Sequence, residues 1–251
     1  MIRLLCLAAA ALCTLAAPAF ATPTEVVVRV ISQDAKFVGD TMGGAEVILR
    51  DARSGVILAK GVTSGETGDT SRIMASSGRS PQRATEVAAA FRTQIDLDRP
   101  TLIRVEIKGS LGAPDTMQRA SSERWLVPGQ SAIVGDGWVI ELPGLAIKFA
   151  SEPSTVFQRG TTSELTAEVQ LMCGCPITPG GLWDAADYEV SAELRRAGSV
   201  RERVELPFVA APGRFKVSWM PQISGKFELV IVARNRATGN TGVLKRKVTV
   251  R

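Results

Sequence analysis

Hydrophobic and polar residues alternate along this chain in many short segments, and long stretches of helical periodicity are nearly absent. In residues 188–194 every second position is apolar, starting with Tyr188, and residues 102–108 alternate in a similar way around Leu, Ile and Val. Alternation with a period of two is typical of a strand that buries one face. The pattern therefore predicts a protein built almost entirely from β-strands.

The expected strands fall into two groups, and turn signals separate them. Two strands end at a Pro-Gly pair, Pro128-Gly129 and Pro143-Gly144, and this pair favours a turn. The first group of expected strands comprises residues 25–31, 45–50, 56–62, 102–108, 125–127 and 137–142. The second group comprises residues 165–172, 188–194, 200–206, 214–220, 226–233 and 243–250.

Three segments depart from this alternation. Residues 65–83 are rich in Ser, Thr, Gly and Arg and have little to bury, which predicts a long mobile loop. Residues 110–122 predict a second polar loop. Residues 84–91 contain Ala and Glu and no residue that breaks a helix, so a short helix is expected there.

Length and composition predict two domains after a short leader. Each domain would hold roughly 100–120 residues, which is a common domain size. We expect a leader at residues 1–21, an N-terminal β-sandwich with long polar loops at residues 22–145, and a C-terminal β-sandwich at residues 146–251. The expected fold class is therefore all-β with two sandwich domains.

Part of the first domain resembles a known kind of module. The segment Gly44-Ala45-Glu46-Val47, the turn Ser54-Gly55 followed by Val56-Ile57-Leu58-Ala59, and the later Thr63 and Gly68 are similar to transthyretin-like, carboxypeptidase-regulatory-like sandwich modules. The resemblance covers about 25 residues. It implies a sandwich fold for the first domain and implies no activity.

Part of the second domain resembles another kind of module. Residues 225–235 read Gly-Lys-Phe-Glu-Leu-Val-Ile-Val-Ala-Arg-Asn, and Thr238-Gly239-Asn240 follows them. This run is similar to the penultimate strand of bacterial immunoglobulin-like modules. The resemblance implies an immunoglobulin-like sandwich for the second domain. The cysteine and tryptophan pattern of antibody domains is absent, because the two cysteines here lie together.

The first 21 residues have the features of an export signal. Arg3 supplies a positive start, residues 4–17 form an apolar stretch, and Ala19-Phe20-Ala21 is a cleavage site of the A-x-A kind. The alternative is an uncleaved membrane anchor, for which the apolar stretch is too short. We expect cleavage after Ala21, which would remove Cys6 and Cys13, and a periplasmic or secreted product with no membrane span.

Composition and charge exclude several classes of function. The chain has no histidine, so catalysis by Ser-His-Asp or Cys-His groups is excluded. No Walker loop or dinucleotide-binding fingerprint is present. The formal charge of +5 is mild and the charges alternate in sign, with Lys245-Arg246-Lys247 as the nearest approach to a basic run. Nucleic-acid binding needs clustered basic residues, so nucleic acid is not an expected partner.

The motif Met172-Cys173-Gly174-Cys175-Pro176 is the strongest candidate for chemistry, because no other cysteine would remain after export. Four interpretations stay open. The two thiolates could bind Cu(I), with Met172, Met42 or Met220 as a further ligand. They could form a redox-active pair. They could link to a partner or cofactor, or they could form a disulfide or buried pair that shapes the loop.

Paired carboxylates offer a weaker signal for chemistry. Asp96 and Asp98 lie where a strand ends before Pro100. Asp184 and Asp187 lie near the cysteines and Trp183, and we expect them to cap a turn before the strand at Tyr188.

These observations favour an exported, non-catalytic binding or accessory protein whose Cys173/Cys175 loop forms the contact or ligand site. A partner protein is possible, and its identity does not follow from the sequence. The first alternative is a periplasmic Cu(I)-binding protein that uses Cys173, Cys175 and Met172 as metal ligands. The second alternative is a thiol-disulfide oxidoreductase. No catalytic residues are assigned, and Cu(I) is the only cofactor considered.

Overall fold

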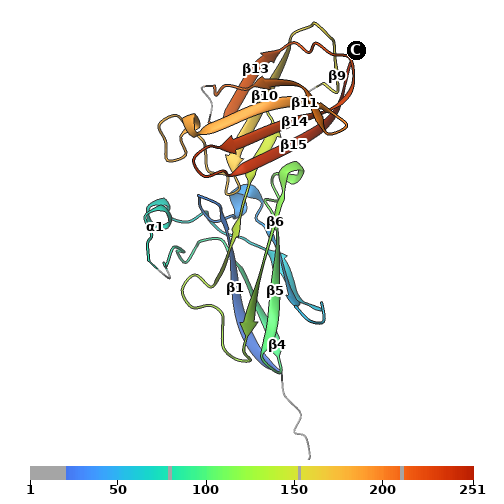
Figure 1. Ribbon diagram of the computed structural model, residues 1–251. Coiled ribbons are helices and arrows are strands. Elements are labelled where there is room, and N and C mark those ends of the chain that lie inside the picture. Colours follow the sequence, from blue (N-terminus) through green and yellow to red (C-terminus); the bar gives the residue numbers. More distant parts are fainter. Residues whose placement is uncertain (1–20, 79–80, 152–153, 210–211) are drawn as a thin grey trace, which may run out of the picture.

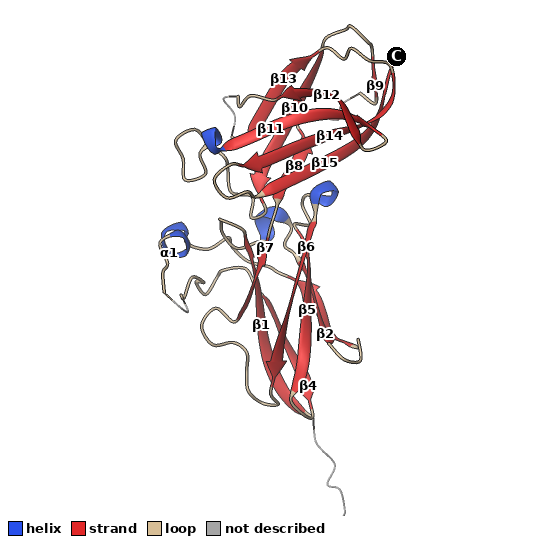
Figure 2. Cartoon of the chain, in the orientation of Figure 1, coloured by secondary structure: helices blue, strands red, loops and turns tan. Residues whose placement is uncertain are grey.

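The computed structural model describes residues 21–78, 81–151, 154–209 and 212–251. Strands make up most of this part of the chain, and they form face-to-face sheets (Figure 2). The all-β sandwich fold class is therefore confirmed. Residues 1–20, which hold most of the predicted export signal together with Cys6 and Cys13, lie outside the described residues.

The first sandwich contains two sheets. The smaller sheet has the strand order β4-β1-β7, in which β1 is antiparallel to β4 and parallel to β7. Its strands are β1 (Thr22–Ser32), β4 (Phe91–Leu97) and β7 (Trp138–Leu142). The larger sheet has the order β3-β2-β5-β6 and is antiparallel throughout. Its strands are β2 (Glu46–Asp51), β3 (Ile57–Val62), β5 (Thr101–Gly109) and β6 (Gln118–Leu126).

The second sandwich also contains two sheets. The smaller one has the order β13-β10-β8 and the larger one the order β12-β11-β14-β15-β9. The strands of the smaller sheet are β8 (Leu145–Phe149), β10 (Ser163–Leu171) and β13 (Arg214–Trp219). Those of the larger sheet are β9 (Val156–Phe157), β11 (Tyr188–Arg196), β12 (Ser199–Glu205), β14 (Gly225–Asn235) and β15 (Thr241–Val250).

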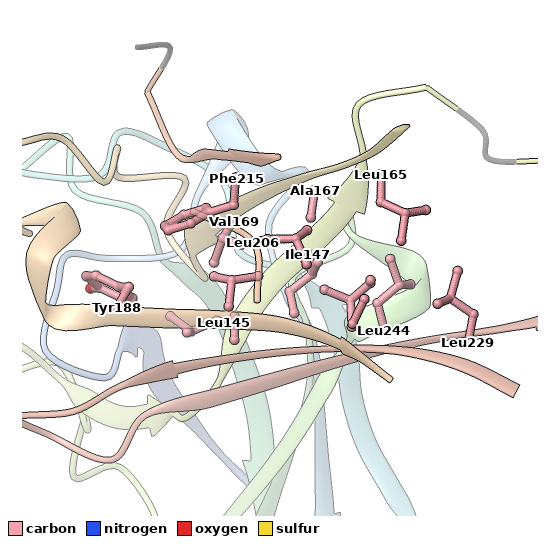
Figure 3. Close-up of a cluster of buried hydrophobic side chains, with 14 of the residues drawn as sticks. Leu145, Ile147, Leu165, Ala167, Val169, Tyr188, Leu206, Phe215, Leu229 and Leu244 are labelled. Atoms are coloured by element: carbon pink, nitrogen blue, oxygen red, sulfur yellow. The ribbon is translucent and has the colours of Figure 1, made fainter. Parts of the chain in front are cut away.

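Alternation along the strands produces the two main hydrophobic cores. On β5, Ile103, Val105 and Ile107 are buried, and on β10 the same period buries Leu165 and Val169. Successive side chains of a strand point to opposite faces, so one face of each sheet can be apolar throughout. Figure 3 shows side chains from both sheets of the second sandwich directed into the space between them.

The expected helix at residues 84–91 is wrong. Ala88 and Ala90 instead form isolated bridges with Glu66 and Ser64, and β4 begins at Phe91. The helix propensity of alanine is a weak preference, and here the small side chains of buried Ala88 and Ala89 pack in a third cluster with Phe37. Packing therefore overrides the local preference.

Two expected loops also differ from the structure. Residues 65–83 contain a short helix, α1 (Thr70–Met74), which the side chain of Asp69 caps by accepting a hydrogen bond from the Arg72 N–H at 2.6 Å. Ile73 of this helix is buried, so the segment does contribute to a core. The second expected loop ends early, because β6 begins at Gln118 and pairs with the end of β5. The sequence of β6 contains many exposed polar residues, so it predicted a loop instead of a strand.

The two sandwiches lie end to end (Figure 1). β7 of the first leads through Pro143 and Gly144 into β8 of the second. Two short 3-10 turns, η1 (Asp40–Met42) and η2 (Pro114–Thr116), lie at the end of the first sandwich that faces the second (Figure 1). A third turn, η3 (Ala185–Asp187), precedes β11. The Cys173/Cys175 loop follows β10 and lies at this junction.

Candidate functional site

The two cysteines of the candidate motif are joined to each other and buried. Cys173 and Cys175 form a disulfide with their sulfur atoms 2.28 Å apart, and their residues are 0% and 4% exposed. Gly174 between them has φ +81° and donates its N–H to the Leu171 carbonyl at 2.8 Å. The left-handed region is readily available to glycine, so this residue type suits the turn.

Neighbouring side chains of the motif belong to different cores. Cys173 and Cys175 pack in the core of the second sandwich, whereas Met172 is fully buried in the core of the first. The exchange is reciprocal, because Ala35, from the segment after β1, packs in the core of the second sandwich. The end of β10 therefore lies where the two cores meet, and we call this contact region the seam.

The methionines proposed as copper ligands are placed differently from one another. Met172 points into the opposite core from the two sulfur atoms of the disulfide. Met42 lies against Gly174, whose Cβ, if it had one, would be 2.9 Å from the Met42 Cγ. Met220 follows β13, whose Trp219 pairs with Ser163 at the other end of β10. At the rise of an extended strand, that end is roughly 25 Å away from the cysteines.

Serines of the first sandwich hold the main chain of Met172. The Met172 N–H donates to the Ser32 Oγ at 3.2 Å, and the Ser110 hydroxyl donates to the Met172 carbonyl. Both serines are buried. A buried backbone group without a partner is costly, so these bonds stabilise the seam.

The loop after the disulfide also reaches the first sandwich. The Trp183 indole N–H donates to the Asp34 carbonyl at 2.9 Å, and Asp34 itself has φ +57°. Leu182, next to this tryptophan, is exposed. The loop therefore contacts the first sandwich through its tryptophan and presents a leucine to solvent.

Asp184 caps the turn as the sequence predicts. Its carboxylate accepts hydrogen bonds from the N–H groups of Ala186 at 3.1 Å and Gly180 at 3.0 Å. These two backbone bonds, the Ala186 bond first, lower the pKa of Asp184. The role of this carboxylate is thus to hold the loop in shape.

Further polar contacts cross the junction away from the disulfide. The Gly144 N–H donates to the Asn240 side-chain oxygen at 2.6 Å, and the Ile147 N–H donates to the Thr116 hydroxyl at 3.2 Å. Arg246 of β15 forms an ion pair with Asp115 of η2 at 3.3 Å. These contacts lie on several separate segments, so they fix the orientation of one sandwich relative to the other.

The bond between the two sulfur atoms limits the chemistry of the Cys173/Cys175 motif. The two sulfur atoms are bonded to each other, so neither is a free thiolate, and a thiolate is the form that binds metal or attacks. Within the described part of the chain, no group of three or more His, Cys, Asp or Glu residues is arranged to hold a metal ion. Asp96 and Asp98 are both exposed. In the same part of the chain, no helix has the length and apolar character needed to cross a membrane.

Sequence reasoning identified the cysteines and missed their surroundings. Ser32, Asp34 and Ser110 are ordinary polar residues at strand ends and loops, and they lie 60 or more positions from their partners in sequence. No local pattern marks them. Their role depends on the arrangement of the two sandwiches.

The sequence matches no protein-family model and none of the curated proteins. Among solved structures, an engineered protein is similar over 50% of this chain, with 17% identity and a TM-score of 0.29, and the match spans 24% of that protein's length. The fibronectin(III)-like modules of CbhA from Clostridium thermocellum match over 83% of this chain and 78% of their own, with 12% identity and a TM-score of 0.29. The fimbrial anchor protein Mfa2 from Porphyromonas gingivalis matches over 89% and 82%, with 11% identity and a TM-score of 0.26.

Proposed function

We propose that this protein is exported and acts as a non-catalytic binding or accessory protein. In this proposal the disulfide-closed loop of Cys173 and Cys175 keeps the two sandwiches in a fixed orientation, so that they present one continuous surface to a partner. The observation that carries it is the position of Met172, whose side chain packs in one core while its neighbours Cys173 and Cys175 pack in the other. The finer assignments, a transthyretin-like first module and an immunoglobulin-like second one, belong to this proposal.

The contact with a partner protein would be made by the outer part of the same loop. Gly180, Gly181 and Leu182 are exposed, while the two cysteines of the disulfide are buried. Trp183 fixes the loop to the first sandwich through its bond to Asp34. A large apolar side chain displayed on a restrained loop loses little conformational freedom on binding, which favours affinity.

Thiol chemistry provides the test of the structural role. In the native oxidised protein we expect no reaction with a thiol reagent and no stoichiometric binding of Cu(I). Cys173→Ser/Cys175→Ser should lower the free energy of unfolding by about 1.5–2 kcal/mol, the contribution that a very short disulfide loop makes through the entropy of the unfolded chain. Urea unfolding measures this loss. An unchanged stability would contradict the structural role.

The same protein samples test the alternatives. Tight Cu(I) binding by the native protein that disappears in Cys173→Ser would replace the proposal with the Cu(I)-binding function. Turnover in an insulin-reduction assay, above the rate of free dithiol, would replace it with the oxidoreductase function. Metal analysis and kinetics separate the two outcomes.

Export has its own test. Expression of the full chain in a Gram-negative host, followed by fractionation and N-terminal sequencing, should give a periplasmic product that begins at Thr22. A product that keeps Met1 and stays in the cytoplasm would contradict export and would leave the structural role of the disulfide untouched.

A further inference from the structure

Arg29 is a buried charged residue in the middle of an apolar strand. It lies on β1 between Val28 and Val30, and only 6% of the residue is exposed. The valines at 26, 28 and 30 point into the core of the first sandwich, so Arg29 lies on the opposite face of the sheet with Val27. Ala132 pairs with β1 along its edge as an isolated bridge with Val26, through a hydrogen bond from the Ala132 N–H to the Glu25 carbonyl at 2.8 Å.

The buried guanidinium has little compensation within the protein. One terminal nitrogen of Arg29 donates to the backbone carbonyl of Asp136 at 2.9 Å. Among the described residues, the Arg29 Nε has no hydrogen-bond partner and no carboxylate oxygen lies within 4.0 Å of its nitrogens. A buried donor without a partner is rare in folded proteins and calls for an explanation.

The nearest carboxylate already has other partners. The Asp136 side chain accepts hydrogen bonds from the N–H groups of Arg83 and Ala84, each at 2.9 Å, and its oxygen lies 3.7 Å from the Arg83 Nε. Burial lowers the pKa of Arg29 and the positive charge of Arg92 lowers it further, while Asp136 acts in the opposite direction. The surroundings therefore leave a cation in need of negative charge.

A groove opens directly beside this cation. We call it the Arg29 groove, and it has a volume of about 520 Å³. Polar residues of its lining include Arg29, Arg92 and Gln94, and Val27 and Ile133 contribute apolar surface. Val27 pairs with Arg92 across the sheet, so the side chains of β1 and β4 project into the groove from the same face.

A negative charge in the Arg29 groove limits the kind of ligand that it can bind. The carboxylate of Glu25 also lines the groove, so the two arginines and this glutamate leave a net charge of about one positive unit there. Repulsion from Glu25 disfavours a dianion or a polyanion and favours a group with a single negative charge. A guanidinium presents paired N–H donors that match the two oxygens of a carboxylate.

From these observations we infer that the Arg29 groove binds a small monocarboxylate with an apolar body, with the carboxylate on Arg29 and Arg92 and the apolar part against Val27 and Ile133. The volume accommodates a molecule of several carbon atoms as well as the charged group. The site does not involve the Cys173/Cys175 loop, so it stands independently of the proposed function.

The test uses the full chain and benzoate as the probe. Saturating benzoate should raise the Tm by about 4–7 °C, the shift that one bound ligand gives at some twentyfold excess over Kd in a chain of this size. It should also shift the NMR signal of the Arg29 Nε–H in a saturable way. Benzyl alcohol, which keeps the ring and lacks the charge, should do neither.

Two variants and a matched control locate the binding. Arg29→Met keeps the aliphatic stem and should abolish the response to benzoate, and Arg92→Gln should weaken binding at least tenfold. Arg99→Gln removes an exposed arginine of the same sandwich and should bind benzoate like the native chain. If Arg29→Met fails to fold, Arg92→Gln decides the outcome, because Arg92 lies at the surface.

Several results would overturn the inference. The absence of a saturable response to benzoate would do so, and so would an equal response in Arg92→Gln and in the native chain. Tighter binding of inorganic phosphate than of benzoate would also contradict it, because the site would then prefer an oxyanion of higher charge. None of these results bears on the disulfide.

Discussion

Gly174 combines two constraints that can be separated by mutation. Its φ of +81° is unfavourable for other residues, and a Cβ at this position would lie 2.9 Å from the Met42 Cγ. Gly198 has a similar φ of +79° and no atom within 4 Å of a built Cβ. The pair distinguishes the cost of the backbone conformation from the cost of crowding at the seam.

We predict that Gly198→Ala lowers the free energy of unfolding by about 1 kcal/mol, the usual cost of a left-handed conformation for a residue with a Cβ. Gly174→Ala should lose a further 1–3 kcal/mol, roughly, because the new methyl group must displace Met42. Urea unfolding of both variants measures the difference. Equal losses of unfolding free energy in the two variants would show that Met42 moves away from the new methyl group at little cost.

The Met172 side chain crosses from the second sandwich into the core of the first. Met172→Ala should lower the free energy of unfolding by about 2–5 kcal/mol, because the deletion leaves a cavity in a fully buried site. Met220→Ala is the matched control at an exposed position, and it should change the free energy by less than about 0.5 kcal/mol. A small effect at Met172 would mean that the seam repacks around the gap.

At the scale of single residues, local roles could be predicted from the sequence and contacts between distant segments could not. The pairing of Cys173 with Cys175 was one of four open interpretations, and the capping role of Asp184 was expected and is confirmed. The roles of Ser32 and Ser110 were not foreseeable, because they exist only when two distant segments meet. Arg29 did carry a signal, since a lone charge in a run of valines is unusual for a buried strand.

Among the elements, strands with strong alternation were predicted well. The expected strands at residues 102–108 and 188–194 appear within β5 and β11. No strand was predicted at β4, whose start follows the alanine-rich segment that favoured a helix. None was predicted at β8 either, which spans the expected boundary at residue 145. The division of the chain at residue 145 stays a prediction.

Glu168 on β10 links its two neighbouring strands through charge. Its carboxylate forms ion pairs with Lys148 of β8 at 3.0 Å and Arg214 of β13 at 2.9 Å, and these bonds, the Lys148 bond first, lower its pKa. A carboxylate with a lowered pKa in the folded state stabilises the fold above its unfolded pKa of about 4.3. This contribution is lost as the pH falls through the folded value.

Glu168→Gln should therefore lower the free energy of unfolding by about 1 kcal/mol at pH 7, and the difference from the native chain should shrink as the pH falls below the unfolded pKa of about 4.3. Glu164→Gln on the same strand is the control, since Glu164 pairs with Lys216 at a more exposed position. Urea unfolding at several pH values gives both curves. A difference that does not shrink as the pH falls would show that the effect of the substitution is steric.

At the scale of the whole molecule, the buried polar contacts at the seam couple the two sandwiches. We predict that hydrogen exchange gives similar opening free energies for β5 in the first and β14 in the second. Ser32→Ala/Ser110→Ala removes both serine bonds to Met172, at a cost of about 1–3 kcal/mol for each buried group left without a partner. The opening free energies should then separate. Separate values in the native chain would mean that the sandwiches unfold independently.

The exchange of Met172 and Ala35 between the two cores has a consequence for how such a chain can evolve. A single sandwich transferred into another gene would lack the side chain that the other sandwich contributes to its core. Its own apolar residue, which normally packs in the other core, would be exposed to solvent. Recombination would therefore have to move both sandwiches together. We expect the pair to be inherited as a single unit, with their connection changing more slowly than their outer loops.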